Sequence, residues 1–231
     1  GRFRTFVEAF EGGWVPSEGD GKHPLIADSG WLAAWDPELP ADGTTLRSLL
    51  KCDATHQTWT DTADASGEGE RYPINCVNWF EAFAFCAWDG GRLATEAEWE
   101  YAAAGGSENR QFPWGNANPT GYANYASSGN SSFLVVGSFP TGEGVWGQHD
   151  LAGSMYEWAL DAYDGDFYSG AGTSCVNCAN LDVDPGAERL ARGGGFSAPY
   201  GNVRAAGRYG GNGYSPRNHS YTRGFRCVRL P

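Results

Sequence analysis

The segment from Arg192 to Arg208 has the most unusual spacing of chemically distinctive side chains in this chain. Arg192 is followed by three glycines and Phe196, and the segment contains no cysteine, histidine, aspartate or lysine. Consecutive glycines allow backbone turns that other residues rarely adopt, and the flanking guanidinium groups can bind carboxylates or carbonyls in a forked geometry. The segment therefore has the form of a binding turn that lacks a thiol and any imidazole, carboxylate or amine base.

The cysteines offer a second possible chemistry. They are Cys52, Cys76, Cys86, Cys175, Cys178 and Cys227. An even number of widely spread cysteines favours disulfides in an exported protein, and Cys76 is the most plausible partner for Cys52. The Cys175-Val-Asn-Cys178 pair could instead be half of a zinc site, but the sequence has no second such pair or clustered histidines to complete it.

Composition limits the classes of partner. The chain has a formal charge of -12, and only two of its sixteen basic residues are lysines. An acidic surface repels phosphate backbones, so we expect no nucleic-acid partner. No segment approaches the ~20 apolar residues that a membrane helix requires. The length of 231 residues, with 34 glycines and 10 tryptophans, predicts one irregular domain.

Two helices in the middle of the chain have clear start signals. Asn78 and Glu81 show the capping-box spacing before apolar residues at helical intervals, and Thr95 and Glu98 repeat it. Glycine pairs at 90–91 and 105–106 predict where these helices end.

The rest of the chain is predicted to be less regular. A short amphipathic helix is expected over residues 2–10, and residues 11–72 read as loops with aromatic anchors. Short strands are expected around Phe139, Trp158, Phe196 and Phe225. The class is α+β. Because "GRFRTFVEAF" reads as the middle of a helix, we expect that an N-terminal portion precedes it.

These segments occur in an order that resembles the formylglycine-generating enzyme, or sulfatase-modifying factor, domain family. The order is "PINCVNWFEAFAFCAWDGGRLATEAEWEYAAAGG", "FPWGN", "WGQHDLAGSMYEWALD", "RGGGF" and "GFRCVRL", and the similarity covers residues 2–231. The resemblance implies one domain over residues 1–231 with the family's variant of the C-type-lectin-like fold. That fold has two main helices, short twisted antiparallel sheets and much irregular structure. The chain looks most like secreted bacterial members, which implies a secreted or cell-envelope location.

The chain departs from this family at the reactive positions. Active members oxidise a substrate cysteine with copper held by two cysteines, placed shortly after the glycine motif. Here Ala198 and, approximately, Tyr200 align with them, and no cysteine lies between Cys178 and Cys227. Because Cu(I) requires soft sulfur ligands, we expect no copper and no formylglycine-generating activity. Related sulfoxide synthases bind iron through histidines, but the four histidines here include no pair at helical ligand spacing.

The resemblance also implies structural calcium. It places one ion on the side chains of Asp150 and Glu157 and the carbonyls of Gly153 and Met155, and a glycine bend beside two carboxylates suits such a hard cation. It places a second ion on Asn124 and the carbonyl of Tyr125, where the shortened loop lacks the usual acidic partner. The resemblance further implies a Cys86–Cys227 disulfide. We pair the remaining cysteines as Cys52–Cys76 and Cys175–Cys178.

Two functional hypotheses follow. The first is a non-catalytic, calcium-braced and disulfide-stabilised extracytoplasmic module that binds or assembles with a protein or peptide. Its candidate contact residues are Trp31, Trp35, Trp59, Tyr200, Tyr209 and Tyr214. The second is an envelope oxidoreductase of altered chemistry that acts on a peptide or small molecule in the former substrate groove. Its candidate groove residues are Arg192, Phe196, Tyr200, Arg204 and Arg208.

Overall fold

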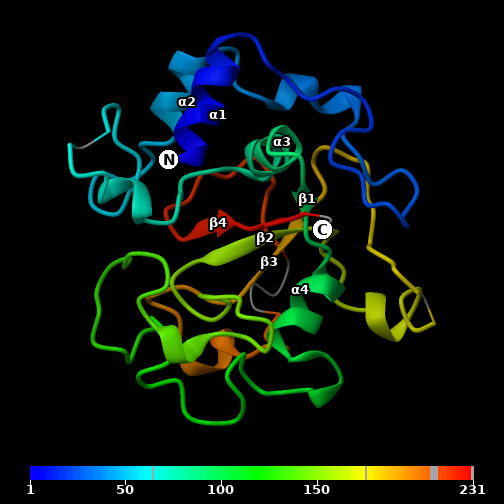
Figure 1. Ribbon diagram of the computed structural model, residues 1–231. Helices are drawn as coiled ribbons and strands as arrows, with labels where there is room; N and C mark the ends of the chain where they lie inside the picture. The colour runs from blue at the N-terminus through cyan, green and yellow to red at the C-terminus, as the bar shows by residue number, and fades with distance from the viewer. Residues whose placement is uncertain (64, 175, 209–212, 230–231) are drawn as a thin grey trace.

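The computed structural model describes residues 1–63, 65–174, 176–208 and 213–229 (Figure 1). The α-helices in these ranges are α1 (Arg2–Glu11), α2 (Gly43–Leu49), α3 (Trp79–Trp88) and α4 (Glu96–Ala103). The strands are β1 (Arg92–Leu93), β2 (Tyr156–Ala162), β3 (Arg189–Arg192), β4 (Arg223–Phe225) and β5 (Cys227–Val228). Short 3₁₀ turns and irregular segments make up the rest, so the mixed and largely irregular fold is confirmed.

The two predicted capping boxes are present. At α3, Glu81 N–H donates to Asn78 Oδ1 at 2.8 Å, and Asn78 N–H donates to Glu81 Oε2 at 3.0 Å. Thr95 and Glu98 make the same reciprocal bonds at the start of α4. Both boxes satisfy backbone donors that the first turn of a helix leaves unpaired.

Helix α2 lies in a region that the sequence predicted to be loop. Asp42 caps it by accepting the N–H of Thr45 at 2.7 Å. The helix has only seven residues and buries only Gly43 and Leu46. So short an apolar stripe gives little helical periodicity, which explains why the pattern was not recognised.

The strands form two small sheets. Strand β1 pairs antiparallel with β5, and the second sheet has the order β3-β2-β4. Strands β2 and β3 are antiparallel, but β2 and β4 are parallel, which corrects the expectation of purely antiparallel sheets. The long segment between β2 and β4 makes this possible, because a parallel pair needs a long crossover connection.

Two of the expected strand positions are also corrected. Phe139 directly precedes a 3₁₀ turn at Pro140–Gly142, and Phe196 follows a turn built by Gly193 and Gly194. Proline cannot donate to a strand ladder, and left-handed glycines bend the chain away from one. Trp158 and Phe225 do lie on strands, as predicted.

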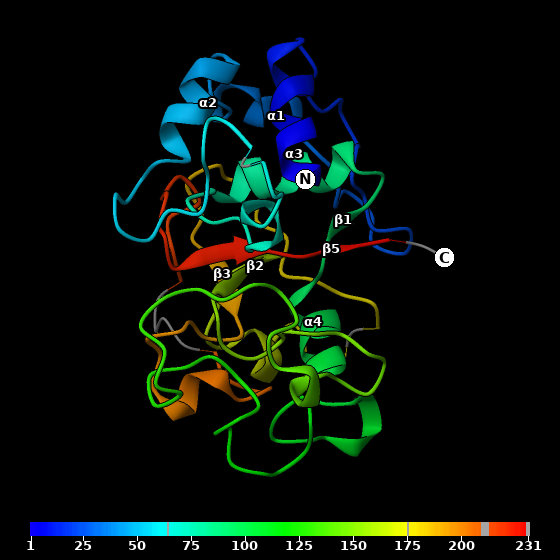
Figure 2. The same cartoon turned by 60° about the vertical axis from the view of Figure 1, so that its left-hand side comes forward.

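An aromatic core fills the side of the sheets that carries α1, α2 and α3 (Figures 1 and 2). Trp31, Trp35 and Trp59 belong to this core, with exposed fractions of 0%, 4% and 4%. Trp35 packs edge-on against Trp79, with ring centroids 5.2 Å apart. These three tryptophans therefore stabilise the fold and are not the contact residues that the sequence indicated.

Two disulfides fix irregular segments to this core. Cys52 bonds to Cys76, and Cys86 of α3 bonds to Cys227 of β5. These are the pairings predicted from the sequence and from the family resemblance. The proposed Cys175–Cys178 pair involves Cys175, which lies outside the described residues.

Asp161 is expected to make stability depend on pH. Its side chain is fully buried and accepts the backbone N–H groups of Glu96 and Asn180. Burial raises the pKa of Asp161 to about 7, so the folded state binds a proton that the unfolded state has released above about pH 4. The free energy of unfolding should therefore fall by about 2–3 kcal/mol between pH 5 and pH 8.

Urea unfolding at both pH values measures this dependence. Asp161→Asn should be less stable, because an amide has one acceptor oxygen for two N–H donors, but its stability should change less between the two pH values. An unchanged pH dependence in the variant would exclude Asp161 as its source.

Candidate functional site

The glycine turn, Gly193–Gly195, follows β3 and leads toward the 3₁₀ turn Tyr200–Val203. Gly193 and Gly194 have φ values of +94° and +76°, a region that favours glycine. A Cβ on Gly194 would lie 2.9 Å from Val203, so there is no space for a side chain. Gly153 N–H donates to Gly193 O, and Phe196 N–H donates to Ser154 O, both at 2.8 Å. The turn is thereby held against the segment before β2.

The residues at the expected cysteine positions are packed into this turn. Ala198 is 4% exposed, and its backbone bonds to Gly195 O and to the N–H of Ala126. Tyr200 accepts a hydrogen bond from Gln111 and packs edge-on against Phe112. No described cysteine is free. The turn thus offers apolar and phenolic groups where a copper site requires thiolates.

The predicted groove arginines instead hold the fold together. Arg192 is fully buried, pairs with Glu100 and lies 3.6 Å from a Glu96 oxygen. Arg208 binds the same Glu96 carboxylate with two hydrogen bonds of 2.6 and 3.1 Å. Since both guanidinium groups are bound to α4, they are not available to a carboxylate substrate.

The other predicted groove residues do not complete an open groove. Phe196 is buried beside Phe133 and Met155. Arg204 is exposed, with its guanidinium carbon 5.2 Å from the ring centre of Tyr200. The expectation of a groove lined by these side chains is therefore corrected, because the turn closes on itself and on α4.

A buried arginine that the sequence analysis missed occupies the other side of the sheet. Arg223 of β4 lies between Tyr214 and Trp158, at 4.1 and 5.1 Å from their ring centres. Its Nε and Nη1 have no hydrogen-bond partner among the described residues, and burial lowers its pKa. Tyr214, a predicted contact residue, is only partly exposed here, and Tyr209 lies outside the described residues.

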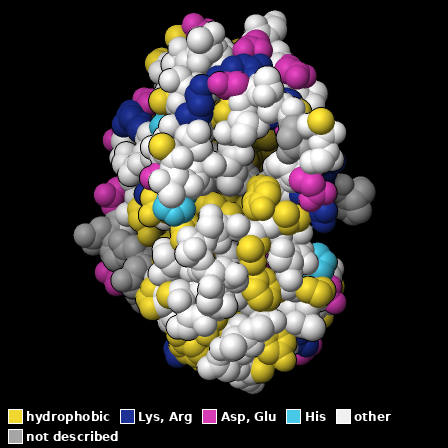
Figure 3. Space-filling model, turned by 90° about the vertical axis from the view of Figure 1, so that its left-hand side faces the viewer, with side chains coloured by type: hydrophobic (Ala, Val, Ile, Leu, Met, Phe, Trp, Pro, Cys, Tyr) yellow, Lys and Arg dark blue, Asp and Glu magenta, His cyan; other side chains and the backbone are white. Residues whose placement is uncertain are grey.

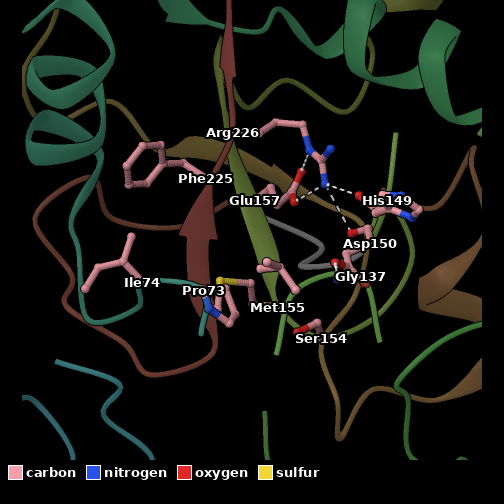
Figure 4. A pocket seen from close by; sticks show the side chains of 11 residues that line it. Pro73, Ile74, Gly137, His149, Asp150, Ser154, Met155, Glu157, Phe225 and Arg226 are labelled. Carbon is pink, nitrogen blue, oxygen red and sulfur yellow. Dashed lines mark hydrogen bonds and ion pairs between the residues drawn. The ribbon is translucent and has the colours of Figure 1, made fainter. Parts of the chain in front are cut away.

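The predicted calcium segment forms a tight bend before β2 (Figure 4). Asp150, Gly153 and Ser154 all have positive φ, and Asp150 Oδ2 accepts the N–H of Gly137 at 2.7 Å. Arg226, which the sequence analysis also missed, binds both oxygens of Glu157 and donates to the carbonyls of His149 and Asp150 at 3.2 Å. Its place in "GFRC", next to a disulfide cysteine, was the available signal.

This donor set suits calcium chemically. Two carboxylates beside a bend supply the oxygen donors that a hard cation prefers. Here Glu157 also accepts Trp99 Nε1 at 2.8 Å, and the Gly153 carbonyl accepts the N–H of Met155 at 2.8 Å, so an ion would have to share these atoms with bonds inside the protein. Arg226 neutralises one of the two negative charges, so Asp150, Glu157 and Arg226 together carry a net charge of -1. Because calcium affinity depends on the charge of the ligands, the segment fits an ion of low affinity.

The proposed second calcium position is already bound within the protein. The Asn124 side chain donates to Ser132 O and accepts from Ser128 Oγ. The carbonyl of Tyr125 accepts the N–H of Ser128. These bonds order the loop with protein groups alone.

A cavity of about 390 Å³ opens beside the calcium segment. Ile74, Met155 and Phe225 supply apolar lining, and His149 and Arg226 lie on its polar side (Figure 4). Hydrophobic side chains gather across the middle of this face of the molecule (Figure 3). The cavity has the mixed lining of a binding pocket.

The histidines are spread over the molecule, each beside a carboxylate. His23 lies 3.2 Å from Glu98, and His219 lies 2.9 Å from Glu81. His56 and His149 face Asp53 and Glu143. Within the ranges that the structure describes, no group of three histidine, cysteine or acidic side chains could bind a metal ion.

Residues 2–231 match the family model described as sulfatase-modifying factor enzyme 1-like domain. The chain is 34% identical over 159 residues to serine/threonine-protein kinase Pkn1 of Chlamydia trachomatis, which covers 69% of this chain and 24% of the kinase. It is 34% identical over 179 residues to the formylglycine-generating enzyme of Streptomyces coelicolor, covering 68% of this chain and 52% of that enzyme. The chain therefore spans about a quarter and about half of these relatives.

A solved structure shows the same fold. PvdO from Pseudomonas aeruginosa has 29% sequence identity and a TM-score of 0.56, with 67% of this chain and 60% of PvdO covered.

Proposed function

This chain belongs to the sulfatase-modifying factor enzyme 1-like domain family. Within that family, we propose that it is a non-catalytic binding or assembly module. The observation that carries the proposal is the content of the glycine turn. Ala198 is buried and Tyr200 is packed where the active members of the family carry copper-binding cysteines. Without sulfur donors the turn has no means of holding Cu(I).

Proteins that are similar to this chain carry names for different activities. One relative is named a serine/threonine-protein kinase and another a formylglycine-generating enzyme. A shared domain with such different names does not by itself fix a reaction, so the activity must be argued from the site.

The proposed setting is extracytoplasmic, with a protein or peptide as partner. Disulfides persist in oxidising compartments, and two of them fix irregular segments of this fold. No helix in the described ranges is long and apolar enough to cross a bilayer. Irregular loops on so rigid a frame are where recognition usually occurs.

Calcium is proposed as a structural ion of this module. Asp150 and Glu157 would hold it, together with the carbonyls of Gly153 and Met155. The consecutive left-handed residues before β2 support this assignment, because they form the bend on which the ligands lie. The ion would stabilise the bend at Gly153 and Ser154 that leads into β2.

Metal analysis of the purified chain, equilibrated with millimolar calcium and then with copper or iron, tests both metal proposals. We expect about one calcium ion per chain with weak affinity, and no stoichiometric copper or iron. One tightly held transition-metal ion per chain would contradict the non-catalytic assignment. Failure of calcium to bind, with copper also absent, would remove only the structural ion.

A further inference from the structure

A second pocket, of about 280 Å³, lies along α4 and has no place in the proposed function. Ala97, Glu100 and Tyr101 of α4 line one side of it with Ala104, which follows the helix, and Asn109 and Tyr168 line the other. Tyr168 belongs to the 3₁₀ turn Phe167–Ser169, which lies beside α4 (Figure 1). The pocket therefore combines two aromatic rings with several polar groups.

The ring of Tyr101 is held in place although it is exposed. Tyr101 and Trp146 are 60% and 53% exposed and stack with centroids 5.5 Å apart at an angle of 13°. Gly106, at φ +63°, fits under the edge of this pair, since a Cβ there would lie 2.9 Å from the Tyr101 ring. Trp146 covers one ring face, which leaves the other for a ligand. Exposed aromatic pairs of this kind are typical of binding surfaces.

The polar groups of the pocket can all accept hydrogen bonds, and the amide and hydroxyl groups among them can also donate. Arg192 binds only one oxygen of Glu100, Oε2. The other Glu100 oxygen, the Asn109 amide and the hydroxyls of Tyr101 and Tyr168 make no hydrogen bond to another described residue. A ligand that presents several N–H donors in one plane would satisfy these acceptors.

The local charge also favours a cation. Glu96 and Glu100 pair with Arg192 and Arg208, so these four charges balance. Asp161, which accepts the backbone N–H of Glu96 and has a pKa of about 7, adds a partial negative charge at neutral pH. Burial, and then the charges of Glu96 and Asp161, raise the pKa of Tyr168. The whole chain carries a formal charge of -12, which adds to the attraction.

We propose that this pocket binds a guanidinium group, the arginine side chain of a protein or peptide partner. A guanidinium stacks flat on an aromatic face and donates hydrogen bonds from its edge. Here it would stack on Tyr101 while its N–H groups reach Glu100 Oε1 and Asn109. The inference goes beyond the proposed function, because it holds whether or not the glycine turn carries out a reaction.

Titration of the purified chain with N-acetyl-arginine amide, followed by NMR, tests the proposal. We expect saturable binding, and binding of the neutral analogue N-acetyl-citrulline amide at least about fivefold weaker because it lacks the charge. N-acetyl-lysine amide should also bind more weakly, since an ammonium cannot stack as a plane. Equal binding of arginine and citrulline, or no saturable binding up to tens of millimolar, would overturn the proposal.

Substitutions of Tyr101 test whether the arginine analogue binds at this ring. Tyr101→Leu should weaken arginine binding at least about fivefold, whereas Tyr101→Phe keeps the aromatic face and should retain most of it. Tyr72→Leu is the matched control, because Tyr72 is 42% exposed and lines a different pocket. The unfolding midpoint of each variant shows whether it is folded. If glucose binds in a way that depends on Tyr101 and the arginine analogue does not bind, the ligand of this pocket is a saccharide. That result would overturn the assignment.

Discussion

Replacing Cys86 and Cys227 together with serine should lower the free energy of unfolding by about 5 kcal/mol. The disulfide joins α3 to β5 across 141 positions of sequence, so it restricts the unfolded chain more than a short bridge can. The Cys227 end lies in a small element, since β5 has two residues and pairs with β1 in the described sheets. Without the bridge, β5 would be held by its two-residue pairing with β1 and by the ion pairs of Arg226 with Glu157 and of Arg229 with Asp89.

Guanidinium unfolding of oxidised protein measures this loss, with the second disulfide as the matched comparison. Cys52 and Cys76 are separated by 24 positions, and their replacement by serine should cost about 3–3.5 kcal/mol. The longer bridge should therefore contribute more. Equal losses, or a larger loss from the Cys52–Cys76 variant, would show that chain entropy does not determine the contribution of these bonds.

Arg192→Met is expected to lower the free energy of unfolding by about 3–5 kcal/mol. The guanidinium is fully buried, binds Glu100 and Ala205 O, and lies 5.4 Å from the ring centre of Trp99. Methionine would fill the space but would leave Glu96, which is 1% exposed, with Arg208 alone as its charged partner. Breaking a buried ion pair leaves a charge that neither water nor the protein fully stabilises.

Arg208→Met provides the control for this result. Arg208 contacts the same Glu96 carboxylate, but its side chain is 21% exposed, so water can take its place. We expect a loss of about 1–2 kcal/mol, clearly below that of Arg192→Met. Urea unfolding of both variants at pH 7 makes the comparison. A small effect of Arg192→Met would mean that Arg192 is not a structural residue and could serve a ligand.

The elements that local signals specify could be predicted from the sequence. The capping boxes at Asn78 and Thr95 depend on residues three positions apart, and a glycine pair follows each helix. The Cys86–Cys227 bond followed from the family resemblance. Helix α2 and the parallel β2–β4 pair could not be predicted, because a short helix has too little periodicity and strand order depends on distant contacts.

The site was harder to predict because sequence does not show which charges pair. Arg192 and Arg208 lie beside the glycine turn in sequence, yet Glu96 and Glu100 of α4 bind them in space. Arg226 and the Tyr101–Trp146 pair were overlooked for the same reason, since their partners lie far away along the chain. An exposed aromatic residue cannot be told from a core residue by type alone.

The glycine turn has a tightly specified backbone and no sulfur atoms that could bind copper. Gly193 and Gly194 are required by close contacts with Trp99 and Val203, and Arg192 anchors the turn to α4. These constraints are structural, and they hold whether or not a metal was ever bound. The turn can therefore persist as a rigid support for recognition elsewhere on the surface.

Incubation of the copper-loaded chain with a cysteine-containing peptide under oxygen tests most directly whether the turn supports copper chemistry. Mass spectrometry would follow conversion of the peptide thiol to an aldehyde, with the Streptomyces coelicolor formylglycine-generating enzyme as the positive control. We predict an unchanged peptide and no copper retained after dialysis. Aldehyde formation by this chain, with copper retained at the Ala198 turn, would contradict the account.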